Sequence, residues 1–265
     1  SRIARKIKYY LDANRSNYFV NSFITGFYMH ESSVLRMVIF DFDGVIADSE
    51  PAHFEMLRLA LQSHHIVLSW DSYCCKYLGY DDTECVQHIL EDYGRPAVSA
   101  LIEEIVAEKQ RNFADYIRQH CLILPGVVEL LGDLQKNGTI CAIHSGAIRS
   151  EIETILAQAR LREYFREIVS TDEVTRSKPD PEGYTLCLTK VNRSLRSDNQ
   201  IKPSQCLAIE DSLWGIQSAK GAGMFCLATE TSYPASQLTL ADKVVKDLTD
   251  IHTADLRQIL NHTRK

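Results

Sequence analysis

The most constraining feature of this chain is an apolar run that stops at two carboxylates. Residues 38–50 read VIFDFDGVIADSE, and the first three residues predict a buried strand. Asp41 and Asp43 follow, and Gly44 permits a tight turn. Two acids this close repel each other unless a cation neutralises them or one keeps a proton. The segment therefore predicts a metal-held carboxylate nucleophile beside a proton-passing acid, although Asp and Gly also favour ordinary surface turns.

Apolar runs of this kind recur along the chain and alternate with helical patterns. The strand-like runs are 36–41, 140–145, 167–170, 206–209, 224–227 and 243–245. The helical patterns between them are 127–134, 148–161, 181–191 and 212–220. Such alternation predicts an α/β fold, with a parallel sheet covered by helices on both faces. Its polar, irregular segment at 192–205 is expected to be a surface loop.

One long segment breaks this alternation. Residues 52–121 contain helical patterns and no convincing strand, so they predict a helical insert hinged near 49–51 and 122–125. We expect the core to comprise residues 37–51 and 122–265. An insert directly after the first strand would lie over the strand's carboxyl end as a lid, which can exclude water and order a substrate.

The first 36 residues differ from the rest, with six Lys or Arg against two acids. Residues 1–36 therefore predict an N-terminal extension, whether a targeting segment, a packed helix or upstream sequence.

The whole chain of 265 residues has a net charge of −6, which gives no support for nucleic-acid binding. No run is long enough to cross a bilayer. The eight cysteines form no Cys-x-x-Cys pair and no zinc spacing, which suits a reducing compartment. We expect a cytoplasmic protein, with organellar targeting by the extension left open.

Two further motifs follow strand-like runs and suit a phosphate group. Residues 142–146 read AIHSG, where the Ser145 hydroxyl and the backbone at Gly146 precede a helix and could bind a phosphate oxygen. Ser145 alone would also make a good helix cap. In SKPDPEGY, Pro179 restricts the backbone of Lys178, whose ammonium could balance phosphate and nucleophile charge. The ordinary alternative is a solvated surface lysine.

A final motif repeats the acidic pair of the first. In LAIEDSLWGI, an apolar strand ends at Glu210 and Asp211 before a helix begins. Hard oxygen ligands of this kind suit Mg²⁺, whereas acids at a helix start are also common without a metal. All four motifs fall at strand-end turns, which meet at one edge of a parallel sheet.

With these motifs in this order, the chain resembles the haloacid dehalogenase-like hydrolases, over about residues 37–250. It is most similar to their helical-cap branch of β-phosphoglucomutase-like phosphatases and mutases. The resemblance implies a Rossmann-like parallel sheet core with an inserted α-helical cap. It also implies a phosphatase that uses Mg²⁺ and an aspartyl-phosphate intermediate. A small phosphorylated metabolite, such as a sugar phosphate, would be its substrate.

The resemblance also implies a role for each motif residue. Asp41 is the nucleophile and Asp43 the acid/base; Ser145 and Lys178, with Gly146 beside them, hold the phosphoryl group. The magnesium ligands are Asp41, the backbone carbonyl of Asp43, and Asp211, with Glu210 close by or acting through water. These roles agree with the positioning and charge cancellation that phosphoryl transfer requires.

Phosphatase and mutase activities both occur in this branch. The positions at which this chain departs from the mutase pattern favour a phosphatase. Asp82 stands about where mutases have an Arg for a second phosphate, and Ala147 replaces a second hydroxyl. His53 and Lys109 favour the alternative, a β-phosphoglucomutase-type phosphohexomutase, because they match a hinge His and a cap Lys of the mutases. Either residue could equally have a structural role.

The same residues bear on two other classes of protein. A carbon–halogen hydrolase would not need Asp43, because no leaving oxygen requires a proton. A non-catalytic phospho-ligand module would be expected to lack at least one of Asp41, Asp43, Lys178 and Asp211. We expect a small phosphorylated metabolite as partner, with no nucleic acid and no membrane; monomer and dimer both stay open.

Overall fold

A parallel sheet forms the centre of the molecule. The structure is a computed structural model, and it describes residues 34–77, 80–117, 119–120 and 123–262. Within these residues, six parallel strands form one sheet in the order β3-β2-β1-β4-β5-β6. The strands are β1 (Met37–Phe40), β2 (Ile140–His144), β3 (Phe165–Val169), β4 (Cys206–Glu210), β5 (Phe225–Thr229) and β6 (Lys243–Val245). Each predicted run overlaps one of them, with the bounds shifted by one or two residues at β3, β4 and β5. The predicted parallel α/β fold is confirmed.

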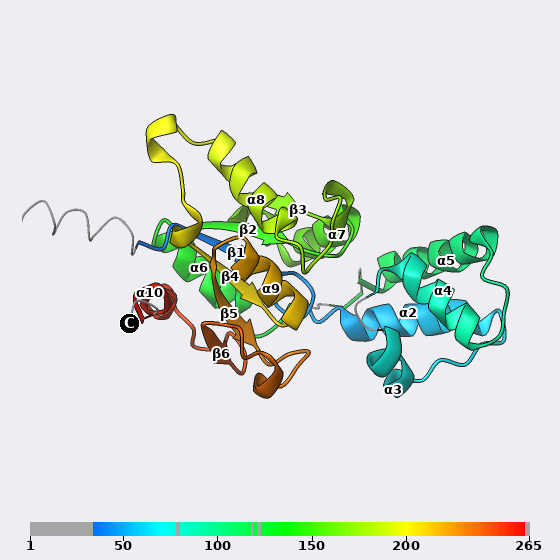
Figure 1. The fold of residues 1–265 in the computed structure, drawn as a ribbon. Helices are drawn as coiled ribbons and strands as arrows, with labels where there is room; N and C mark the ends of the chain where they lie inside the picture. The colour runs from blue at the N-terminus through cyan, green and yellow to red at the C-terminus, as the bar shows by residue number, and fades with distance from the viewer. Residues whose placement is uncertain (1–33, 78–79, 118, 121–122, 263–265) are drawn as a thin grey trace, which may run out of the picture.

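Helices cover both faces of this sheet (Figure 1). Because strand side chains alternate between faces, Val38 and Phe40 of β1 pack on one side while Met37 and Ile39 pack on the other. The first face is covered by α6 (Val127–Lys136), α7 (Arg149–Ala159) and α10 (Thr253–His262). The second is covered by α8 (Glu182–Arg193) and α9 (Leu213–Gly221). Burial on both faces explains why the strands read as continuous apolar runs.

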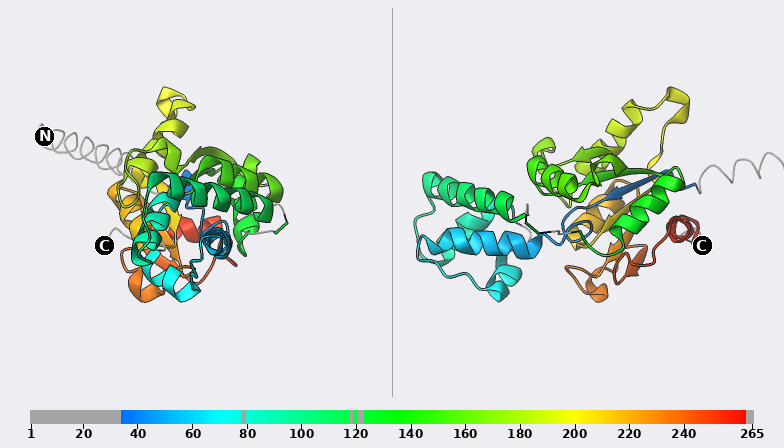
Figure 2. Two further views of the ribbon diagram at one scale, coloured as in Figure 1. Left: turned by 90° about the vertical axis from the view of Figure 1, so that its right-hand side faces the viewer. Right: turned by 180° about the vertical axis from the view of Figure 1, so that it is seen from behind.

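A second group of helices follows β1. It comprises α2 (Glu50–Gln62), α3 (Trp70–Ser72), the π-helical turn Tyr73–Tyr77, α4 (Asp82–Asp92) and α5 (Ser99–Ile117). These helices enclose an apolar cluster of their own, which includes Leu61, Ile89 and Ile105. Figures 1 and 2 show the group beside the sheet, at the end toward which β1 runs. The chain passes into it directly from the segment that carries Asp41 and Asp43.

Some parts of the chain depart from the sequence predictions. Helix α10 was not predicted, although Leu256, Ile259 and Leu260 have helical spacing and pack against the first face. The predicted loop at 192–205 contains two short 3₁₀ turns, Ser197–Asn199 and Pro203–Gln205. Of the predicted N-terminal extension, residues 1–33 lie outside the described residues.

Among the described residues, no helix has both the length and the apolar character needed to span a membrane.

Candidate active site

The predicted site residues of the core meet at the carboxyl edge of the sheet. Strand β1 lies between β2 and β4, and the register places Phe40 opposite Ile143 and Ile209. Asp41 follows β1, and its amide donates a hydrogen bond to Ile209 O at 2.9 Å. Ser145 follows β2 and Glu210 ends β4. Because neighbouring parallel strands end together here, residues far apart in the sequence become neighbours.

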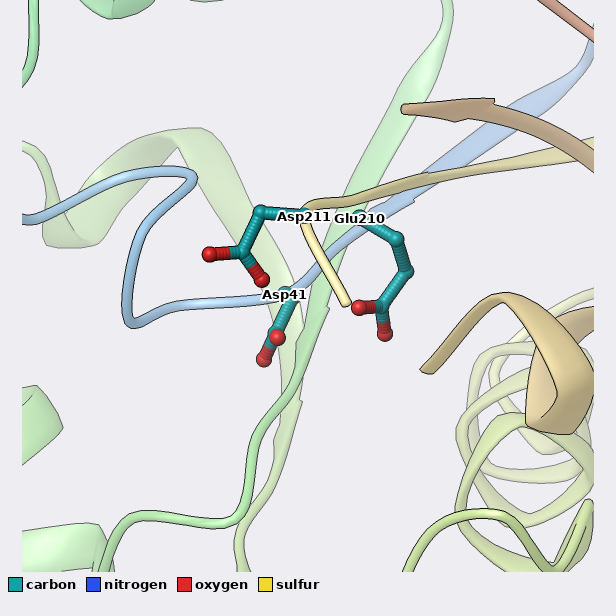
Figure 3. A group of neighbouring side chains, drawn as sticks. All are labelled: Asp41, Glu210 and Asp211. Atoms are coloured by element: carbon teal, nitrogen blue, oxygen red, sulfur yellow. The ribbon is translucent and has the colours of Figure 1, made fainter. Parts of the chain in front are cut away.

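Three buried carboxylates form a cluster at this edge. Asp41, Glu210 and Asp211 each offer an oxygen, and these atoms lie within 4.8 Å of one another (Figure 3). Burial and the nearby Asp41 carboxylate raise the pKa of Glu210 to about 7 and the pKa of Asp211 well above its ordinary value. Gathered carboxylates with this mutual repulsion are the oxygen donor set that suits Mg²⁺. The residues present therefore fit the expected metal.

Gly44 makes the close approach of Asp211 possible. Its φ is +73°, and a Cβ at this position would lie 1.9 Å from Asp211 Oδ2. Asp211 Oδ2 also accepts a hydrogen bond from the hydroxyl of Ser232, in the loop after β5. The turn after Asp43 is thus shaped around the second acidic motif.

Lys178 is held between two of the acids. Its Nζ lies 2.8 Å from Asp41 Oδ1 and 2.7 Å from Glu210 Oε1, and only 13% of its side chain is exposed. Burial disfavours the ammonium, but Asp41 and Glu210 outweigh that effect and raise the pKa of Lys178. The alternative of a solvated surface lysine is therefore wrong. A permanent positive charge lies directly beside the expected nucleophile.

Asp43 lies near the helical group, since its Oδ1 is 4.0 Å from Nε2 of His53 in α2. Its carboxylate accepts hydrogen bonds from the hydroxyl of Ser49 and, at 3.3 Å, from Ser145 Oγ. Burial, reinforced by the charge of Asp41, raises the pKa of Asp43. A carboxyl group in this environment retains its proton more readily than a free aspartate, which suits a proton donor.

Ser145 differs from the helix cap considered as its alternative. Helix α7 is preceded by Ile148, which has no side-chain capping bond. The Ser145 hydroxyl instead accepts a hydrogen bond from Ala147 N at 2.9 Å and donates to Asp43. Gly146, also predicted for phosphate, is exposed, and no neighbouring atom of the described residues lies within 4 Å of the position a Cβ would take.

The two residues predicted from the helical insert lie together at its inner side. His53 Nε2 is 4.0 Å from Asp43 Oδ1, and His53 Nδ1 is 2.8 Å from Lys109 Nζ. Burial and the Lys109 charge lower the pKa of His53 well below its ordinary value, so the imidazole is neutral. Lys109 also forms an ion pair with Asp82, and the His53 ring stacks on Phe113 at 4.2 Å. The ammonium of Lys109 is thus already paired.

Sequence reasoning missed three residues that contact the site, and it also missed Glu50, an ionisable neighbour whose pKa the charge of Asp43 helps to raise. Ser49 and Ser232 bind Asp43 and Asp211, and Tyr184 donates to Glu210 Oε1 at 2.5 Å. Glu50, in the first turn of α2, accepts from the Tyr73 hydroxyl, and burial raises its pKa to about 7. Tyr184 belongs to the SKPDPEGY motif and was the easiest to find. Ser232 lies in a polar loop that carries no comparable signal.

Comparisons with known proteins identify the family. A family model described as haloacid dehalogenase-like hydrolase matches residues 38–229. The validoxylamine A 7'-phosphate phosphatase of Streptomyces hygroscopicus subsp. limoneus is 28% identical over 228 residues, which are 82% of this chain and 95% of that protein. The phosphorylated carbohydrates phosphatase of Thermotoga maritima is 28% identical over 191 residues, covering 72% of this chain and 82% of that protein.

A solved structure has the same fold. The β-phosphoglucomutase of Clostridium difficile aligns with a TM-score of 0.73 at 22% identity, over 86% of this chain and 98% of that one. The Rossmann-like core and the resemblance predicted from the motifs are both confirmed, as is the predicted enzyme class, a phosphatase of this family. The chain belongs to the haloacid dehalogenase-like hydrolases.

Proposed function

We propose that the protein hydrolyses the phosphate monoester of a small phosphorylated carbohydrate, with Mg²⁺ and an aspartyl-phosphate intermediate. The observation that carries this proposal is the contact of Lys178 with Asp41, beside Glu210 and Asp211. A lysine and gathered acids around one buried aspartate provide for both the charge of a phosphoryl group and that of its metal. The names of two relatives, both phosphatases of phosphorylated carbohydrates or their analogues, support the substrate class.

The chemistry follows from the positions of the two aspartates. A carboxylate oxygen of Asp41 attacks phosphorus and the ester bond breaks, while Asp43 gives its proton to the leaving oxygen. Asp43 then takes a proton from water as that water attacks the aspartyl phosphate, which releases inorganic phosphate and restores Asp41. Ser145 and Lys178 hold the phosphoryl oxygens, and the exposed backbone at Gly146 lies beside them.

The residues that would hold Mg²⁺ are Asp41, the backbone carbonyl of Asp43, and Asp211, with Glu210 next to them. The ion would cancel negative charge on the phosphoryl oxygens. Without such a cation, three carboxylates remain gathered in a buried place, which is costly.

This proposal assigns different roles to two parts of the chain. Residues 37–51 and 122–265 form the catalytic core, and residues 52–121 act as a cap that selects the substrate. His53 and Lys109 would contact the substrate from the cap. The cytoplasm is the proposed compartment, because Cys141, Cys206 and Cys226 are buried and form no disulfide among the described residues.

The charge of the cap favours hydrolysis over phosphoryl transfer between two positions of one sugar. A mutase must bind a second phosphate, and the ion pair with Asp82 leaves Lys109 little charge for one. Ala147, near the phosphoryl site, offers no second hydroxyl. One observation favours the alternative phosphohexomutase: the contact of Lys109 with His53 brings a cap lysine close to Asp43.

Release of phosphate from p-nitrophenyl phosphate tests the proposal. We expect turnover that disappears on chelation with EDTA and returns with Mg²⁺. A chain that binds phosphate without releasing it from any ester would be a phospho-ligand binding module. Formation of glucose 6-phosphate from β-glucose 1-phosphate, dependent on a bisphosphate primer, would identify the mutase and refute the hydrolytic assignment. A panel of sugar and polyol phosphates then ranks substrates by kcat/KM.

A further inference from the structure

Tyr184 lies behind the catalytic lysine and has no assigned role. It belongs to the first half of α8, shortly after the loop that carries Lys178, and its side chain is fully buried. Its hydroxyl donates a hydrogen bond to Glu210 Oε1 at 2.5 Å, and Lys178 Nζ lies 5.8 Å from the centre of its ring. The tyrosine therefore touches both the lysine and the acid that holds the lysine.

Glu210 is clamped by its surroundings into one orientation. Its Oε1 accepts from Tyr184 and from Lys178, and its Oε2 lies 3.4 Å from Ser212 Oγ. The backbone of Gly215 leaves no room on the other side, because a Cβ there would lie 1.8 Å from Oε2. A carboxylate with both oxygens engaged in this way has little freedom to rotate.

The orientation of Tyr184 is itself fixed by packing. The ring of His144 meets it edge-on, with centroids 4.9 Å apart and planes at 85°. The adjacent Gly183 approaches His144 so closely that a Cβ would lie 2.0 Å from Cε1. Since neither ring has space to turn, the tyrosine hydroxyl keeps its direction toward Glu210.

We propose that Tyr184 is a positioning residue for Lys178: its hydroxyl orients Glu210, and Glu210 holds the lysine ammonium against Asp41. This inference rests on the proposed function, because Lys178 is taken to bind the phosphoryl group. In this role the tyrosine would act through Glu210, which its hydroxyl contacts, rather than through a contact of its own with substrate or metal. Loss of its hydroxyl should free the carboxylate to rotate, so that Lys178 spends less time where a phosphate oxygen can meet it.

The test compares Tyr184→Phe with the unchanged parent protein. Isothermal titration calorimetry measures the Kd of Mg²⁺ alone and the Kd of inorganic phosphate with Mg²⁺ saturating. Because a hydrogen bond to a charged group is lost, we expect the phosphate Kd to rise about tenfold. The Mg²⁺ Kd should change by less than about twofold, since Asp41, Asp211 and the Ser232 contact stay in place. An unchanged phosphate Kd would overturn the proposal, as would equal weakening of both Kd values with a lower Tm.

Tyr164→Phe is the matched control. This tyrosine lies just before β3, at the amino edge of the sheet, whereas the site lies at the carboxyl edge. It packs against the first face of the sheet. The same chemical change there should leave both Kd values as in the parent protein. A rise in the phosphate Kd equal to that of Tyr184→Phe would overturn the specific role of Tyr184.

A double-mutant cycle with Glu210→Gln tests whether the tyrosine acts through Glu210. Glu210→Gln keeps the side-chain volume and should raise the phosphate Kd at least as much as Tyr184→Phe. Adding Tyr184→Phe to Glu210→Gln should then change the phosphate Kd by less than about twofold, because the effects of residues that act through one another are not additive. Independent, multiplying effects would refute the proposed route.

These measurements separate this inference from the proposed function. A parent protein that binds Mg²⁺ and phosphate but hydrolyses no ester would refute the hydrolase. The difference in phosphate Kd between it and Tyr184→Phe would still decide the role of the tyrosine. A parent protein that binds no phosphate would overturn both.

Discussion

Two lysines illustrate how the core and the helical group differ. Lys178 and Lys109 are both held by two partners, yet Lys178 lies between the carboxylates of Asp41 and Glu210 while Lys109 lies between Asp82 and the neutral His53. The partners of Lys178 extend from adjacent strand ends, so the sheet itself sets their distance. Those of Lys109 come from α2 and α4, two helices whose packing against α5 brings them together.

In the proposed function, this difference assigns the phosphoryl chemistry to the core and substrate selection to the helical group. Charges at a sheet edge are held by backbone hydrogen bonds and act on any phosphoryl group that enters. Charges on a helical group follow the packing of that group, and in the proposed function they would lie nearer the rest of the substrate. Changes in the core should therefore affect all substrates alike, whereas changes in the helical group should affect some substrates more than others.

The largest effect is expected from the core residue Asp41. In Asp41→Asn the side chain no longer presents a charged oxygen for attack, so turnover of every substrate should fall by about four orders of magnitude or more. Phosphate release and circular dichroism provide the measurement. Asp48→Asn, an exposed acid in the same segment, is the control and should retain activity. Substantial turnover by a correctly folded Asp41→Asn would exclude the nucleophile.

A smaller but still uniform effect is expected from Asp43. In Asp43→Asn neither the leaving oxygen nor the attacking water exchanges a proton with the side chain, which should cost about 10²- to 10⁴-fold in kcat. Rapid-quench kinetics should find both formation and hydrolysis of the aspartyl phosphate slowed. A change confined to KM would contradict the acid/base assignment.

The buried interior of the core should also respond to pH. Burial, with a contribution from Lys178, lowers the pKa of His144 to about 4 from an ordinary value near 6.5. The unfolded chain therefore binds an extra proton between these values, so the folded state loses stability as pH falls from 6.5 toward 4. The loss should be about 2 kcal/mol at pH 5.

Denaturant unfolding of His144→Asn at several pH values provides the measurement. The slope of unfolding free energy against pH between 6.5 and 4 should be shallower in this variant, because the titrating group is gone. His65→Asn, at an exposed position with φ of 58° that Asn tolerates, should keep the original slope. An unchanged slope in His144→Asn would show that other groups dominate acid unfolding.

The smallest effect, and the one that depends on the substrate, is expected from the helical group. Asp82→Asn frees Lys109 from its ion pair, so KM for substrates with a second anionic group should fall about fivefold, or about 1 kcal/mol. Turnover of p-nitrophenyl phosphate should not change. An equal effect on both substrates would remove the distinction between the core and the helical group.

The acidic and basic motifs of the core could be found in the sequence because each follows an apolar run. In a parallel sheet, the turns that follow the strands all lie at the carboxyl edge. The grouping of Asp41, Lys178, Glu210 and Asp211 therefore followed from the order of the elements. Helix α10 and the loop serine Ser232 escaped prediction for opposite reasons. The first has an ordinary amphipathic pattern beyond the last motif, and the second has no local pattern at all.

The residue pattern alone was enough to predict the α/β alternation, the helical insert after the first strand, and the charged residues at the strand ends. Local periodicity and turn chemistry encode these features within a few residues of each other. The partners that each charge meets became known from the three-dimensional fold. That Lys109 is paired with Asp82, and that Tyr184 reaches Glu210, depends on packing between segments distant in the chain. Such contacts leave no period in the sequence, because the free energy that forms them comes from burying whole elements together.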